Sequence, residues 1–183
     1  MTKVWATRSA MMFFVDSLWG YVQMDVLASE FHKLQAVVTA TAGADAESGD
    51  FEAIQKGHRE FLDTCLKSLF LEDGGGAGGK EGSGGAVGGM KKFVGGSLKS
   101  CLGTCDLFAG IVRNRLGRGG AGMDGEDVRK LWDEISKVKE DFDQHSSFLF
   151  RILSGVQDTA RKSHHLDALL LRLDHNLFYS MSS

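Results

Sequence analysis

Gly74–Lys80 (GGGAGGK) has the letters of a phosphate-binding loop, G-x-x-x-x-G-K. In such a loop, glycine amides cradle phosphates between a strand and a helix, and the next Ser or Thr holds Mg²⁺. Here a predicted helix precedes the glycines, and Glu81 stands where the hydroxyl is needed. Low-complexity sequence explains the match, as it explains two G-x-G-x-x-G matches at 74–79 and 117–122. We therefore expect no nucleotide site and no cofactor.

Cys101 and Cys105 are four residues apart, a spacing that places two potential metal ligands on one face of a helix. His58 and Cys65 are the candidates to complete such a site. Structural zinc sites use several closely spaced ligand pairs in turns, and this chain has one pair. Cysteines on an apolar helix face are more often reduced core residues. We expect no metal site, and we expect His58 to be a hydrogen-bonded buried histidine.

The spacing of serines, carboxylates and histidines in the sequence does not indicate a catalytic site. No serine lies in a nucleophile elbow, and no two carboxylates have the helical spacing of an acid–base pair. His164 and His165 follow Arg161 and Lys162, as at a solvated helix start. We therefore expect no catalytic residue, and a protein that is not an enzyme.

A polar line crosses an otherwise apolar segment near the start of the chain, Met11–Leu27. A helix this apolar is expected in the centre of a bundle. Its polar residues recur every seven positions, with Asp25 close by: Ser9, Asp16, Gln23 and Glu30. The pattern leaves two interpretations open, a solvated face or a surface for a partner protein.

The elements that would position these residues are helices. The chain has no Pro, which suits long uninterrupted helices because Pro breaks a helix interior. Periods of three and four predict helices over residues 3–40, with a break near Gly20 or Ser29, and over 50–71, 97–116, 126–159 and 163–173. In the second of these, one face with helical period is expected from Phe51, Ile54, His58, Phe61, Leu62, Cys65, Leu66, Leu69 and Phe70. The prediction is an all-α bundle of about five long helices, with two Gly-rich loops.

We treat residues 1–183 as a single domain with a flexible insertion at 73–96, which holds 12 of the 24 glycines. Such composition does not offset the entropy lost on ordering. A formal net charge of -3 argues against a nucleic-acid partner. No run reaches the 18 uncharged apolar residues of a membrane span, so we expect no membrane partner.

Four segments, in this order, resemble the carboxyl-terminal end of the gamma-tubulin complex proteins, and most of all the smallest members of that family. They are FFVDSLWGYVQMDVLASEF (13–31), DFEAIQKGHREFLDTCL (50–66), HSSFLFRILSGV (145–156) and HLDALLLRLDHNLFYS (165–180). Together with their surroundings they cover most of the chain. Four motifs in order are far more specific than any one of them.

The resemblance implies a helical domain that binds gamma-tubulin alongside other gamma-tubulin complex components and supports microtubule nucleation. It implies a location in the cytoplasm and cytoskeleton, at a microtubule-organising centre such as the centrosome or spindle pole. The polar residues that carry the match are expected either to lock helices together, for instance by an Asp–Arg pair, or to contact gamma-tubulin: Asp16, Gln23, Asp25, Arg172, Asp174 and Asn176. The alternative function is a truncated helical scaffold without nucleation activity.

Overall fold

The computed structural model describes residues 2–42, 50–71, 86–116, 124–159 and 164–174. Within these ranges the chain is helical and contains no strand, which confirms the all-α prediction. Five continuous helical rods run through the described residues. They are α1 (Thr2–Gly20), η1 (Tyr21–Ala28) and α2 (Ser29–Ala42) in one rod, α3 (Asp50–Ser68), α4 (Ala86–Ile111) with η2 (Val112–Leu116), α5 (Gly125–Thr159) and α6 (His164–Leu173).

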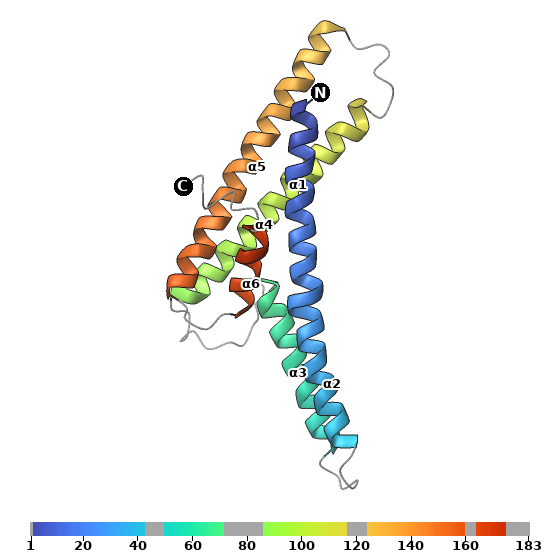
Figure 1. Cartoon of the computed structure of the whole chain (residues 1–183), viewed down its shortest axis with the longest axis vertical. Helices are drawn as coiled ribbons and strands as arrows, with labels where there is room; N and C mark the ends of the chain where they lie inside the picture. The colour runs from blue at the N-terminus through green and yellow to red at the C-terminus, as the bar shows by residue number, and fades with distance from the viewer. Residues whose placement is uncertain (1, 43–49, 72–85, 117–123, 160–163, 175–183) are drawn as a thin grey trace, which may run out of the picture.

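The first rod is one long helix whose winding changes in the middle. Its central segment η1 is π-helical, so its turns are wider than those of α1 and α2. The change begins after Gly20 and ends at Ser29, the two positions where the sequence suggested a break. The helix continues through both, and Figure 1 shows α1 and α2 as one rod from end to end.

The core lies where α1, α4, α5 and α6 meet, near the middle of Figure 1. Phe14 of α1 contacts Phe142 of α5 edge to face, with ring centroids 5.7 Å apart. The α5 helix starts on a side-chain cap, in which Asp124 Oδ1 accepts hydrogen bonds from the amides of Glu126 (2.9 Å) and Asp127 (2.8 Å). Its apolar positions then repeat with helical period into the core: Leu131, Ile135, Val138, Phe142, Leu149 and Leu153.

A two-helix arm, made of α2 and α3, extends away from this core. The helices approach closely at Gly57, where a Cβ would lie 3.3 Å from Val37 Cγ1. Because α3 packs mainly on α2, much of its predicted apolar face has no second partner. Phe51 is 74% exposed, and Leu62 and Leu66 are also exposed. The apolar face predicted on α3 is therefore only partly buried.

The α4 helix begins at Ala86, eleven residues before the start predicted at 97. Residues 86–96, which the sequence analysis placed in the glycine-rich insertion, form the first turns of α4. Burial of Val94 explains the ordering, since it gives the segment an apolar anchor. Gly95 then permits close contact with the end of α3, because a Cβ there would lie 3.1 Å from the Phe70 carbonyl oxygen. The remainder of the predicted insertion lies outside the described residues.

Candidate partner-binding surface

Two of the six polar residues singled out from the sequence form a contact inside the molecule. Asp25 in η1 accepts hydrogen bonds from Arg172 in α6, through Nε to Oδ2 and through Nη2 to Oδ1 at 3.0 Å. The hydrogen bond with Asp25 raises the pKa of Arg172 above its ordinary value. Of the two roles expected for this pair, the structure shows the internal lock between the first rod and the last helix.

The surroundings of this pair explain how it forms. Gly20 lies beside the guanidinium, and a Cβ at that position would be 2.8 Å from Arg172 Nη1. One residue further on, the fully buried Tyr21 donates its hydroxyl hydrogen to the carbonyl oxygen of Ser68, at 2.8 Å. The start of η1 is therefore joined both to α6 and to the end of α3. Burial, and secondarily the charge of Asp25, raise the pKa of Tyr21 well above its usual value.

Three of the other four polar candidates lie among the described residues. Asp16 is exposed on α1, and Gln23 is half-buried in η1. Asp174 is half-buried just after α6, where its amide donates to the carbonyl of Leu170 at 3.0 Å. Asn176 lies outside the described residues. A partner-binding role for these residues stays a prediction.

The seven-residue polar line of the first rod does not remain on one face. Ser9 and Asp16 are exposed, whereas Glu30 is buried and pairs with Lys33 at 2.7 Å. The step from residue 23 to residue 30 crosses the π-helical η1, whose wider turns shift the angular position of later residues. The idea of one continuous wet stripe was therefore wrong beyond Gln23.

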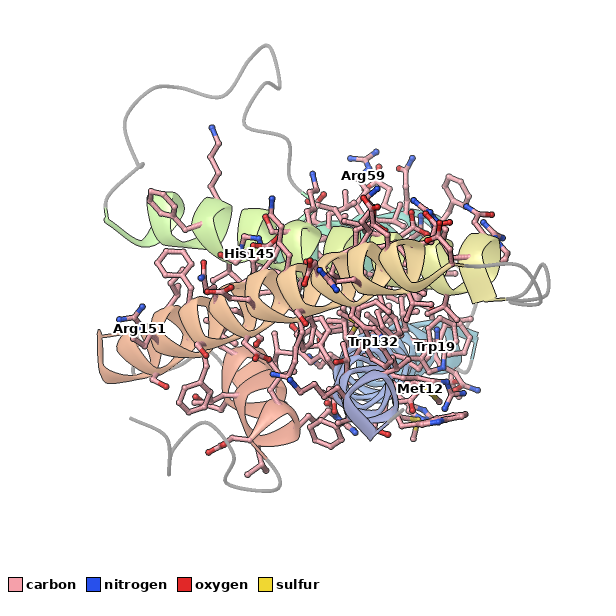
Figure 2. All side chains as sticks on the ribbon, turned by 90° about the horizontal axis from the view of Figure 1, so that it is seen from above. Met12, Trp19, Arg59, Trp132, His145 and Arg151 are labelled. Carbon is pink, nitrogen blue, oxygen red and sulfur yellow. The ribbon has the colours of Figure 1, made fainter. Side chains whose placement is uncertain are left out.

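An exposed apolar line on the same rod was not anticipated. We call it the apolar ridge, and it consists of Trp5, Met12, Trp19, Met24, Phe31 and Val38, all between 39% and 64% exposed. The spacing is seven along α1, five across η1 and seven again along α2. The hydrogen bonds of a π-helix join residues i and i+5, so its turns hold more residues than those of an α-helix and the spacing changes with the winding. Figure 2 shows Met12 and Trp19 on the same side of the rod.

The ridge has the character of a docking surface, because large apolar side chains gathered on one exposed face mark interaction sites. Trp5 is 60% and Trp19 is 64% exposed, and Arg8 stacks over the Trp5 ring at 5.5 Å. The seven-residue spacing of Trp5, Met12 and Trp19 is visible in the sequence. It was missed because the whole segment was assigned to the core.

The residues considered for metal and acid–base chemistry have other surroundings. Cys101 is buried, and burial raises its pKa to about 12. Cys105 is half-buried, with a pKa raised by burial to about 11. His58 is exposed on α3, so the expectation of a buried histidine was wrong. Among the described residues, no three His, Cys, Asp or Glu side chains form a group that could hold a metal ion. None of the helices described is long and apolar enough to cross a membrane.

Comparison with known proteins defines the class. The model of the gamma-tubulin complex component carboxyl-terminal family matches residues 1–179. The chain therefore belongs to the gamma-tubulin complex component family, as its four motifs indicated.

Gamma-tubulin complex component 4 of mouse and of human are each 31% identical to it over 182 residues, covering 97% of this chain. A homologue of component 4 from Medicago truncatula is 23% identical over 182 residues, covering 99% of the chain. The chain spans 22% of the length of the mouse and human relatives. No solved structure gives a significant match.

Proposed function

We propose that this chain binds gamma-tubulin and thereby acts in microtubule nucleation, without catalysis of its own. The observation that carries the proposal is the family match, which runs through residues 1–179. Other gamma-tubulin complex components would be further partners, and a microtubule-organising centre in the cytoskeleton would be the place of action.

The apolar ridge is the surface that we assign to gamma-tubulin. Interfaces draw most of their affinity from a few aromatic side chains that are desolvated on binding. Trp5 and Trp19 provide two such side chains on a continuous helix. Asp16 lies on the same helix and would provide a polar contact at the margin of the interface. The bundle behind α1 would hold this face rigid, because Met11 and Phe14 of α1 are buried in the core.

The test is retention of purified gamma-tubulin by the immobilised chain, with a folded sample verified by circular dichroism. We expect retention by the wild type and a loss of at least tenfold in affinity for Trp19→Ala. Phe93→Ala is the matched control, because Phe93 on α4 is also 64% exposed and does not belong to the ridge. A folded wild type that retains no gamma-tubulin would overturn the proposal in favour of a helical scaffold. Equal loss in both variants would refute the assignment to the ridge.

A further inference from the structure

A furrow runs between α1 and α4 on the flank of the apolar ridge. Both helices pack against α5, and between them two cavities follow one another along the same faces. The first has a volume of about 540 Å³ and is lined mainly by Met11, Met12, Val15, Cys105, Phe108 and Val112. The second, of about 280 Å³, is lined mainly by Leu18, Val22, Leu69, Phe70, Leu98 and Leu102. The lining of both is almost entirely apolar.

The lining residues of the two cavities follow one another on the same faces of the first rod and of α4, so we treat the two cavities as one furrow. On α4, residues 98, 102, 105, 109 and 112 follow one another at spacings of three and four, which is one face of a helix. On the first rod, residues 11, 15, 18 and 22 do the same. The stretch from residue 8 to residue 22 extends for about 21 Å at 1.5 Å per residue. That length accommodates a helix of about 14 residues.

The charges beside the furrow have a predominant sign. Arg8 and Arg113 line the first cavity and Lys99 lines the second, against the single acidic residue Asp16. These four side chains are exposed and make no ion pair with the residues described. An occupant with carboxylates along its edges would meet this excess of positive charge. Basic edges would be repelled.

We infer that the furrow is a binding site for an amphipathic helix of another polypeptide, with an apolar face bordered by acidic residues. Helix-in-groove recognition uses side chains at i, i+3, i+4 and i+7 that enter an apolar groove. The furrow supplies apolar walls from the first rod and α4, with Leu69 and Phe70 after α3 in the second cavity, together with a length of four turns and cationic edges. This site shares Met12 and Asp16 with the surface proposed for gamma-tubulin, but its other wall is α4, and its occupancy is measured without gamma-tubulin.

The test uses a synthetic peptide of about 14 residues, cross-linked to hold a helix because isolated helices of this length are marginal. Leucines occupy i, i+3, i+4 and i+7 positions, and glutamates occupy the edges. A second peptide carries lysines at the edges. By titration calorimetry with the full chain, we expect saturable binding of the acidic peptide, at least tenfold tighter than that of the basic peptide. No binding, or equal binding of the two peptides, would overturn the inference.

Variants locate the binding. Ala109→Glu places a larger, negatively charged side chain in the furrow. It should therefore weaken the binding of the acidic peptide at least tenfold. Leu107→Glu is the matched control, because Leu107 is an exposed residue of α4 outside the furrow. Binding unchanged by Ala109→Glu would overturn the inference.

Arg113→Glu provides a second variant should Ala109→Glu unfold, and it should weaken binding several-fold. Arg151→Glu is its control, since Figure 2 shows Arg151 far from Met12 and Trp19. Equal effects of the two substitutions would contradict the role of the cationic edge. Sedimentation equilibrium without peptide tests whether a second copy of this chain occupies the furrow instead. A dimer that Ala109→Glu dissociates would show that a second copy fills the furrow, and would overturn the inference.

Discussion

Asp25 and Arg172, 147 residues apart in the chain, are joined by two hydrogen bonds between η1 and α6. The pair is partly buried, with the Arg172 side chain 36% and the Asp25 side chain 24% exposed. It ties the first rod to the last helix at the point where the winding changes. The two parallel hydrogen bonds match the planar guanidinium to the carboxylate, so a lysine amine at position 172 would not form the same contact.

Removal of either partner should lower stability. We expect Asp25→Ala and Arg172→Ala each to cost about 1–2 kcal/mol, because each leaves a partly desolvated charge without its partner. A double-mutant cycle from urea unfolding should give a coupling of about 1 kcal/mol. The exposed pair Lys56–Glu60 on α3, at 3.9 Å, is the control and should couple by about 0–0.5 kcal/mol. Equal coupling in the two pairs would contradict a special role for Asp25–Arg172.

The effect of Gly20→Ala on stability should depend on the residue at position 172. In the wild type, Gly20→Ala should destabilise the fold, because the new Cβ would lie 2.8 Å from Arg172 Nη1 and displace the guanidinium from Asp25. In an Arg172→Ala background the same change should stabilise by up to about 1 kcal/mol, since Ala favours a helix over Gly. Thermal unfolding of the four variants measures this. The same sign in both backgrounds would contradict the proposed packing.

Two neighbouring glycines test the start of α4. Gly96→Ala should stabilise the fold by about 0.5–1 kcal/mol, because position 96 is helical and a Cβ there meets nothing within 4 Å. Gly95→Ala should gain less or lose stability, because its Cβ would lie 3.1 Å from a backbone carbonyl oxygen and 3.2 Å from the Phe70 Cβ. Denaturant midpoints give the difference. No gain from Gly96→Ala would support the original assignment of this segment to a loop.

Stability should fall at alkaline pH. Burial raises the pKa of Tyr21 above its ordinary 10.0 and that of Cys101 from 9.0 to about 12. Between pH 9 and 12 the folded state therefore retains protons that the unfolded state has lost. Its stability is fully present below pH 9 and declines as the pH rises. Urea unfolding at pH 8 to 11 under reducing conditions should show a shallower decline in a Tyr21→Phe/Cys101→Ala variant. An identical decline of stability in the variant and the wild type would contradict the role of Tyr21 and Cys101 in the pH dependence.

Local sequence predicted most of the helical elements. The absence of Pro and the three-four periodicity placed α3, α5 and α6 within a few residues of their observed bounds, because both signals act within a turn or two of helix. The sequence also predicted the family, because the four motifs that characterise it occur in the chain in the right order. The structure confirmed these helices, and the family model confirmed the family.

Exposure was less predictable, because it depends on what lies across from a helix. Phe51 and Leu62 have the period of a buried face, yet α3 has mainly α2 as a neighbour and leaves them exposed. Conversely, glycine-rich residues 86–96 looked unable to order, yet packing around Val94 makes them part of α4. Local composition carries no information about such distant partners.

The sequence by itself determined an all-helical chain of the gamma-tubulin complex component family, through the helical period of its apolar residues and the order of its motifs. It also named Asp25 and Arg172, but it left open whether they face each other or a partner. Only the tertiary structure decided that they pair, that Glu30 is buried and that Trp5, Met12 and Trp19 form an exposed ridge. The physical reason is the π-helical winding of η1 together with the packing of α6 beside it, which set the direction of each side chain.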